Sequence, residues 1–97
     1  MAIFTLAPGA VSRPVAHRTV EELWYVTAGA GRLWRKRGDH EAVTDLAPGV
    51  SLAIPPNTHF QFRCEGPTPL VIVAATMPPW PGESEARPVP GKWEPRL

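Results

Sequence analysis

One histidine and two adjacent glutamates lie within six residues of each other, in the stretch HRTVEE at residues 17–22. An imidazole and a carboxylate at this spacing can bind a divalent metal ion, or can act as acid and base in proton transfer. Residues two apart in a strand share a face, so Glu22 lies on the same face as Trp24 and Val26. That face is predicted to be buried, which would carry Glu22 inward. Glu21 has the right parity to His17 but shares a face with Leu23 and Tyr25, so periodicity alone leaves both glutamates open as partners of His17.

The five-residue separation of His17 and Glu22 raises a geometric problem. In one straight strand the two side chains would point to opposite faces. They converge only if the chain turns a corner between Arg18 and Glu21. A carboxylate that is buried beside Trp24 also needs a positive charge, a hydrogen-bond donor or a metal ion close to it. The sequence therefore predicts a bend in this segment if the pair acts together.

A third candidate ligand, His59, stands in the stretch PGVSLAIPPNTHFQFRCEG at residues 48–66. Phe60, Phe62 and Cys64 alternate with polar residues, which predicts the buried face of a strand. By this alternation His59 belongs to the polar face, and it points inward only if a bulge or the preceding turn re-orients it. Cys64 is the single cysteine, which excludes an internal disulfide and a cysteine-based zinc site and favours a place in the core.

The elements that must position these residues are short apolar runs separated by glycine and proline. No helical periodicity is present, and strands with turn signals between them at this spacing are typical of an all-β sandwich or barrel. The predicted strands are Ile3–Leu6, Glu22–Thr27, Arg32–Lys36, Ala42–Leu46, Val50–Ile54, Phe60–Cys64 and Leu70–Thr76. The basic residues around Arg35 and the turn at Gly38 predict a solvated hairpin tip, where His40 is given no role.

Length and charge narrow the class of protein. The 97 residues suffice for one domain, and a net charge of +1 without a basic groove argues against a nucleic-acid partner. No apolar run reaches the length of a membrane-spanning helix, and the first residues lack the basic start of a signal peptide. We therefore expect no membrane partner and a cytoplasmic location.

The last twenty residues differ in composition from the rest, because prolines and two tryptophans are concentrated there. The prolines exclude a central strand, while Trp80 and Trp93 are costly to leave in water. We predict a β-barrel domain over residues 1–77 and an arm over residues 78–97 that packs on the barrel or on a neighbouring subunit. Leu70–Ala75 is apolar on both faces, and this run, the small core and the arm favour a homodimer.

Two motifs in these stretches resemble those of the cupin superfamily. In HRTVEELWYVTAGAG, six residues separate Glu22 from Gly29, as in the first cupin motif, and PGVSLAIPPNTHFQF places Gly49 and Pro55 as in the second. The resemblance extends over residues 9–77 and is greatest to a small single-domain subgroup described as mannose-6-phosphate-isomerase-like. It implies a cupin-type antiparallel β-barrel, also called a double-stranded jelly roll.

The resemblance also implies a metal site inside the barrel. It would place a divalent metal ion (Fe, Mn, Ni or Zn) on His17, Glu22 and, if it turns inward, His59. Val15 and Phe60 stand where the family has two further histidines. The implied pocket residues are Val15, Trp24, Phe60 and Phe62.

Two functions fit this sequence, and it leaves open whether the protein is an enzyme. The first is a metal-dependent enzyme of the isomerase or oxygenase type that acts on a small polar metabolite. The second is a non-catalytic cupin that binds a small molecule and has a degraded metal site. A phosphorylated substrate would need a cation in the pocket; Arg18, Arg32 and Arg63 are the candidates, although alternation places Arg63 outward.

Overall fold

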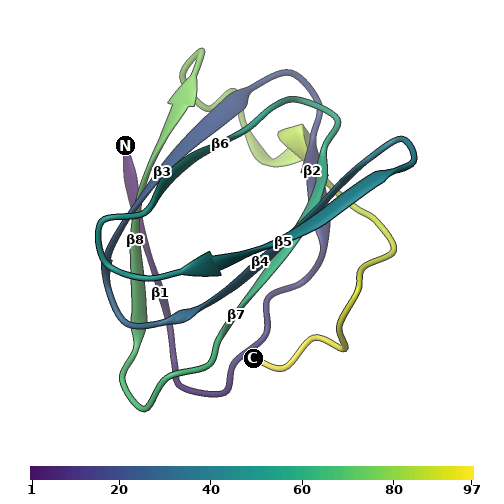
Figure 1. The fold of residues 1–97 in the computed structure, drawn as a ribbon. Coiled ribbons are helices and arrows are strands. Elements are labelled where there is room, and N and C mark those ends of the chain that lie inside the picture. Colours follow the sequence, from purple (N-terminus) through teal and green to yellow (C-terminus); the bar gives the residue numbers. More distant parts are fainter.

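Two antiparallel sheets face each other and enclose the core, as Figure 1 shows. The computed structural model describes residues 1–97 apart from the side chain of Glu83. The elements are β1 (Ala2–Leu6), β2 (Val15–His17), β3 (Glu21–Ala28), β4 (Gly31–Arg37), β5 (His40–Leu46), β6 (Ser51–Ile54), β7 (His59–Cys64), β8 (Leu70–Met77), the 3-10 turn η1 (Glu83–Glu85) and β9 (Ala86–Pro88). The predicted all-β barrel is thus confirmed.

The strands are distributed unequally between the two sheets. One sheet has four strands in the order β1-β8-β3-β6, and the other has five in the order β5-β4-β7-β2-β9. All pairings are antiparallel. In the part of the chain that the structure describes, no helix is long and apolar enough to cross a membrane.

Seven of the strands were predicted from the apolar runs, whereas β2 and β9 were not. Both are three residues long and pair with each other, with Val15 opposite Pro88. A three-residue strand is too short to show an alternating pattern in the sequence, so it forms only because neighbouring strands pair with it. Pro88 lies in the edge strand of the sheet, where a missing backbone N–H is tolerated.

Two turn residues show why the sequence carries the spacings that it does. Gly29, between β3 and β4, has a φ of 84°, and a Cβ there would collide with the backbone of Pro69 and Leu70. Only glycine fits this position. Asn57, between β6 and β7, has a φ of 63°, a backbone conformation that asparagine adopts more readily than most residues with a side chain.

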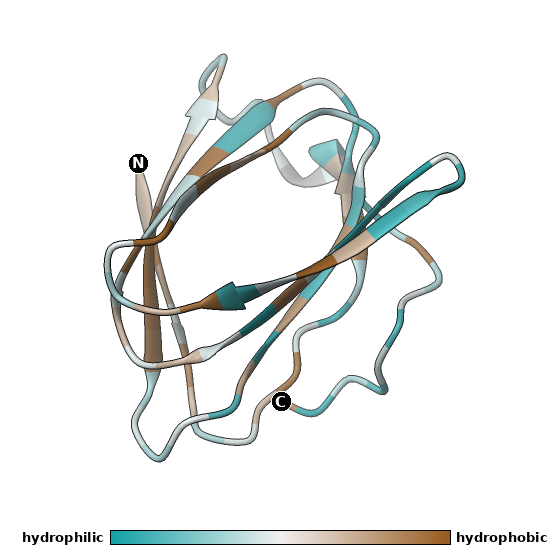
Figure 2. Ribbon diagram, in the orientation of Figure 1, coloured by the Kyte–Doolittle hydropathy of each residue, from teal (hydrophilic) through white to brown (hydrophobic). Residues whose placement is uncertain are grey.

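Trp24 lies at the centre of the core, between the two sheets. Its ring centroid lies 4.9 Å from that of Phe62, 6.0 Å from that of Phe60 and 6.3 Å from that of Phe4, all in edge-to-face geometry. Such pairs contribute about 0.5–1.5 kcal/mol each beyond simple burial. Cys64 belongs to the same buried cluster, as predicted. In Figure 2 hydrophobic colours run along β8 and β3, and hydrophilic colours gather on the projecting β4–β5 hairpin.

The C-terminal segment lies along the outer face of the five-stranded sheet, which Figure 1 shows on the side away from β1 and β8. It is anchored there by Gln61 of β7, whose side chain is fully buried. The side-chain oxygen of Gln61, Oε1, accepts hydrogen bonds from the backbone N–H groups of Lys92 and Trp93, at 3.0 and 2.8 Å. Its amide nitrogen donates to the carbonyl oxygens of Ser12 and Trp93, at 2.9 and 2.7 Å.

Candidate functional site

The predicted corner between His17 and Glu22 is present, and it carries the chain from one sheet to the other. His17 ends β2 in the five-stranded sheet, and Glu22 lies near the start of β3 in the four-stranded sheet. Because the two strands face each other across the core, both side chains point inward. They are 4% and 3% exposed, and His17 Nδ1 lies 3.6 Å from Glu22 Oε2. The predicted preference for Glu22 over Glu21 agrees with this placement, since Glu21 is only half-buried.

The two oxygens of the Glu22 carboxylate have different surroundings. Oε1 accepts a hydrogen bond from the indole N–H of Trp24, at 2.5 Å. Oε2 faces His17 Nδ1 at a distance too long for a good hydrogen bond. His17 Nδ1 is buried and has no hydrogen-bond partner among the described residues. A buried polar atom in this state is uncommon and marks a position where a ligand or a small shift would complete a bond.

His17 is held between two aromatic rings. Its ring centroid lies 5.2 Å from that of Phe60 and 5.1 Å from that of Trp80, with interplanar angles of 78° and 79°. Phe60 comes from β7 in the core, whereas Trp80 comes from the segment that follows β8. The imidazole is therefore covered on one side by the barrel and on the other by the C-terminal arm.

A cavity of about 580 Å³, which we call the mouth cavity, is bordered by Trp80, the residue that covers His17; neither His17 nor Glu22 is itself among its walls. Its walls are Met1, Ala2, Phe4, Ala74, Thr76, Pro79 and Trp80. The sheet register places it inside the barrel, because Thr76 of β8 is the cross-strand neighbour of Glu22 and Ala74 is the neighbour of Trp24. Trp80 belongs to both sites, since it lines the cavity and covers His17.

The third predicted ligand, His59, lies apart from the pair. In β7 it is the cross-strand neighbour of Ala16 on one side and Lys36 on the other, and no bulge interrupts either pairing. Since Phe60 points into the core, His59 points outward, as its alternation indicated. Burial lowers the pKa of His59, and the charges of Arg87 and Lys36 lower it further. The positive charges of Arg87 and Lys36 near His59 would also repel a divalent metal ion.

The sequence matches the family described as Cupin domain over residues 2–76. The chain belongs to the cupin family. No curated protein sequence matches it at a significant level.

Solved structures with the same fold include enzymes and assembly proteins. The chain is similar to a dTDP sugar isomerase of Desulfovibrio desulfuricans, with 21% identity and a TM-score of 0.82 over 92% of this chain and 62% of that chain. It is similar to the capsular polysaccharide assembling protein CapF of Staphylococcus aureus, with 16% identity and a TM-score of 0.77 over 88% of this chain and 26% of that one. It is also similar to oxalate decarboxylase of Bacillus subtilis, described with Mn(II) centres, with 23% identity and a TM-score of 0.71 over 74% of this chain and 19% of that one.

These similarities establish the fold alone, because all three identities are low. The cupin chain spans less than two thirds of the length of each of these three proteins. Their activities, and the Mn(II) of oxalate decarboxylase, therefore do not transfer to this chain without support from its own residues.

The residues of this cupin do not fit the three-ligand metal site that the resemblance implied. A catalytic metal site uses three protein ligands and keeps a position open for water or substrate. Here His17 and Glu22 are the only two donors that converge, and among the described side chains no group of three histidines, cysteines or carboxylates is close enough to hold a metal. Val15 and Phe60, at the two remaining family positions, are apolar and pack in or against the core.

The predicted pocket residues mostly fill the barrel. Val15, Trp24, Phe60 and Phe62 lie in the core cluster or pack against it, and none of them lines the mouth cavity. The cavity walls come instead from β1, β8 and the arm. The inward alternation of Ala2 and Phe4 gave a signal for this, whereas the position of Trp80 depends on where the arm folds back.

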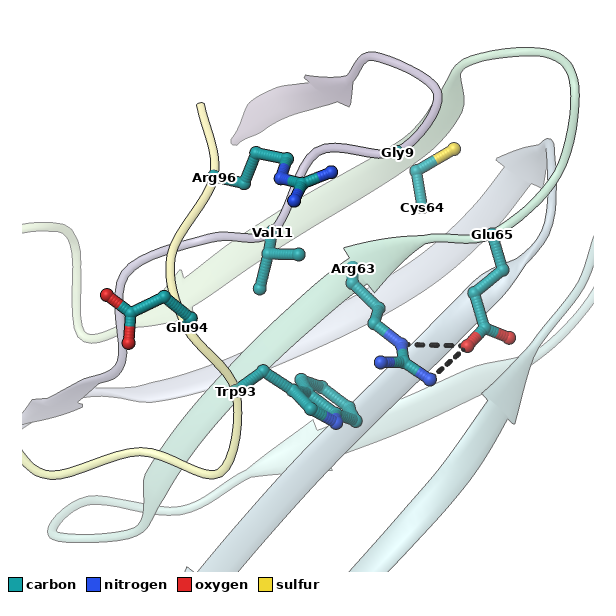
Figure 3. A pocket seen from close by; sticks show the side chains of 8 residues that line it. All are labelled: Gly9, Val11, Arg63, Cys64, Glu65, Trp93, Glu94 and Arg96. Atoms are coloured by element: carbon teal, nitrogen blue, oxygen red, sulfur yellow. Dashed lines mark hydrogen bonds and ion pairs between the residues drawn. The ribbon is translucent and has the colours of Figure 1, made fainter.

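A second cavity, of about 530 Å³, lies on the outside of the barrel beside the arm. Figure 3 shows Arg63 stacked against Trp93 and paired with Glu65. The Arg63 guanidinium lies 4.4 Å from the ring centroid, and its Nε donates to Glu65 Oε2 at 2.7 Å.

The other two arginines that were candidates for phosphate binding are also engaged away from the mouth cavity. Arg32 pairs with Asp45 and with Glu65, at 3.5 and 3.3 Å. Arg18 donates from Nε to the Ser84 carbonyl oxygen at 2.8 Å. Neither these two nor Arg63 lines the mouth cavity, and its described walls include no arginine, lysine or histidine side chain.

Proposed function

We propose that this cupin binds a small, largely apolar organic molecule in the mouth cavity, with the polar end of the molecule directed toward Glu22 and His17. The observation that carries the proposal is the position of this buried, incompletely hydrogen-bonded pair beside a cavity of about 580 Å³. That volume lies within the range of about 300–1,000 Å³ that is typical of small-molecule sites. Binding of a metal ion is not required for this function.

The chemistry of the walls narrows the ligand class. Phe4, Trp80, Pro79 and the alanines offer carbon surfaces, and Thr76 supplies a hydroxyl next to Glu22. A sugar phosphate would lose its hydration in such a cavity without gaining an arginine or lysine side chain as a partner. A ring or short aliphatic chain with one hydrogen-bond donor fits better, because Thr76, the cross-strand neighbour of Glu22, offers a hydroxyl acceptor at the cavity wall.

The test is a binding screen on two variants, each with one alanine of β8 replaced by leucine, on opposite faces of the strand. Ala74→Leu fills the cavity, whereas Ala75→Leu makes the same change at the next residue of β8, on the outer face. Small aromatic and aliphatic amines, alcohols and acids are titrated while tryptophan fluorescence is followed. We expect a ligand that binds the wild type and Ala75→Leu but not Ala74→Leu, and equal binding to all three would place the site elsewhere.

Metal analysis completes the test. We expect protein purified without chelators or a histidine tag to hold Fe, Mn, Ni and Zn far below one ion per chain, also after incubation with each ion. One tightly bound ion per chain that disappears in His17→Ala would overturn the metal-independent proposal and return the metal-dependent enzyme as the better hypothesis.

A second candidate function is proton transfer on a bound substrate. It is favoured by the 3.6 Å approach of Glu22 Oε2 to His17 Nδ1, because a carboxylate that orients an imidazole can support a general base. Similarity in fold to a sugar isomerase is consistent with this chemistry. Exchange of a substrate C–H hydrogen in D₂O, followed by NMR, would reveal it. We expect His17→Asn to abolish the exchange and His59→Asn to retain it; exchange that persists in His17→Asn would exclude the imidazole as base.

We further propose that two copies of the chain pair through the outer face of the four-stranded sheet. Tyr25 and Ile3 are 51% and 68% exposed on that face, and both lie beside Val73. Leu23 and Met77 extend the same apolar surface. An isologous dimer needs one patch that complements itself, and a mainly apolar sheet face, with Glu21 at one end beside Met77, meets this need.

A further inference from the structure

Glu85 is a buried carboxylate in the C-terminal arm, far along the chain from the candidate site. Its side chain accepts hydrogen bonds from the Thr19 backbone N–H at 2.5 Å, the Thr19 hydroxyl at 2.6 Å and the Val20 backbone N–H at 3.0 Å. It is 4% exposed, although it lies on an irregular segment near the chain end. The three donors all belong to the corner between His17 and Glu22.

Two further bonds tie the same corner to the arm. The backbone N–H of Arg18 donates to the Glu85 carbonyl oxygen at 2.9 Å, and Arg18 Nε donates to the Ser84 carbonyl oxygen at 2.8 Å. Backbone donors at a tight, partly buried bend cost free energy when they have no partner. The arm thus supplies the partners that the corner cannot find within its own segment.

Electrostatics support the same arrangement. Burial by itself raises the pKa of Glu85, but hydrogen bonds from the Thr19 hydroxyl and from the backbone of Thr19, Val20 and Arg18 outweigh it and lower the pKa to about 2. The carboxylate is therefore charged at neutral pH and attracts all of these donors.

We propose that Glu85 is a positioning residue for the His17–Glu22 pair: by capping residues 18–20 it fixes the corner that turns His17 toward Glu22. The same arm segment brings Trp80 onto the His17 ring and into the wall of the mouth cavity. The site is thus built partly by the barrel and partly by the arm. The effect on ligand binding rests on the proposed function, whereas the effect on the position of His17 does not.

A second anchor of the arm allows positioning to be separated from general stability. Gln61 holds the arm at Lys92 and Trp93, and its hydrogen bonds do not involve the corner. Loss of this anchor should loosen the chain end and lower stability but leave His17 where it is. Glu94 provides a matched acid, because it lies in the same arm and is exposed.

The experiment compares NMR signals of the His17 imidazole and the Trp80 indole at pH 8 in five variants of the full chain. These are Glu85→Ala, Glu85→Gln, Thr19→Val, Gln61→Ala and Glu94→Ala, with the His17 signal assigned by its loss in His17→Gln. We expect Glu85→Ala to shift both signals strongly. Glu85→Gln and Thr19→Val, which keep part of the cap, should shift them less in the same direction, and Gln61→Ala and Glu94→Ala should leave them unchanged.

The outcomes separate the two proposals. Unchanged signals in the Glu85 and Thr19 variants, or an equal shift in Gln61→Ala, would overturn the positioning role. If Glu85→Ala does not fold, Glu85→Gln and Thr19→Val decide the question. A ligand found in the fluorescence screen should bind Glu85→Ala about tenfold more weakly, a loss equivalent to one or two net hydrogen bonds. A shifted His17 signal with no ligand for any variant would support the positioning role and count against the proposed function.

Discussion

The outer faces of the two sheets are treated differently by the same chain. The five-stranded sheet carries polar and charged side chains, and the arm covers part of it through the fully buried Gln61. The four-stranded sheet leaves Ile3, Leu23, Tyr25 and Met77 exposed on its outer face, while Pro79 and Trp80 of the arm meet this sheet at the mouth cavity, on its inner side. The apolar face is thus the uncovered one, which is the reverse of what hydrophobicity alone would predict.

The difference lies in what each face offers to a proline-rich segment. Prolines have no backbone N–H, so the arm pairs poorly with a strand edge, but its remaining backbone groups, such as those of Lys92 and Trp93, still need partners. The Gln61 amide supplies both a donor and an acceptor for that backbone, whereas an aliphatic sheet face supplies neither. The arm therefore selects the polar face, and the apolar face is left for a partner that is itself apolar, which we propose is a second copy of the chain.

The largest expected effect comes from placing a charge on the uncovered face. Tyr25→Glu would bury two like charges at an isologous interface, which costs several kcal/mol. Light scattering should therefore change from the mass of two chains to the mass of one. Val43→Glu is the control, because Val43 is 42% exposed on β5 of the other sheet. A wild-type protein that is monomeric, or a dimer that Val43→Glu dissociates equally well, would contradict the proposed interface.

A second effect concerns the covered face. Gln61→Ala removes four hydrogen bonds and leaves several part-buried backbone groups without partners, which should lower the free energy of unfolding by about 3 kcal/mol. Ser51→Ala, at an exposed position of the four-stranded sheet, should change it by less than about 0.5 kcal/mol. Urea denaturation measures both values. Similar values for the two variants would mean that the arm contributes little to stability.

A third comparison sets the inside of the barrel against its outside. Trp24 donates to the buried Glu22, and Trp34 donates to Glu41, which is exposed. Trp24→Phe strands a carboxylate away from water, whereas after Trp34→Phe the Glu41 carboxylate can turn to solvent. We expect Trp24→Phe to destabilise the protein by about 2 kcal/mol more than Trp34→Phe does, since both changes lose the same volume. Denaturation followed by far-UV circular dichroism tests this, and equal losses would mean that the Glu22 carboxylate remains hydrated.

Much of the fold was predictable because its signals are local. Alternation indicated the inward side of β3, where Glu22 lies, and of β7, where it put His59 on the polar face; the inward turn that a role of His59 as a metal ligand required is absent. Gly29 and Asn57 belong to residue types that favour turns, and both have positive φ values in the structure. The strands β2 and β9 were missed because each is three residues long and exists through its partners.

The site was predictable only where residues close in sequence determine its geometry. The bend between His17 and Glu22 followed from their spacing, but what holds it did not. The Thr19 and Glu85 partners are 66 residues apart in sequence, and a glutamate in a proline-rich tail carries no sign that it will be buried. Trp80 was expected to be shielded from water, but its position over His17 depends on the same long-range contact.

The smallest expected effect is a pH dependence that belongs to the arm. The folded protein holds the pKa of Glu85 at about 2, well below its ordinary value of 4.5, so the cap contributes its full stability above pH 4.5 and loses it as the pH falls toward 2. The stability difference between the wild type and Glu85→Gln should therefore shrink steadily over that interval in urea titrations. His59, whose pKa is also lowered, acts in a separate window below its ordinary value of 6.5 and is present in both proteins, so its effect cancels. A difference that stays constant from pH 5 to pH 2.5 would mean that the charge of Glu85 does not contribute to stability in the corner, and the proposed cap would then not depend on ionisation.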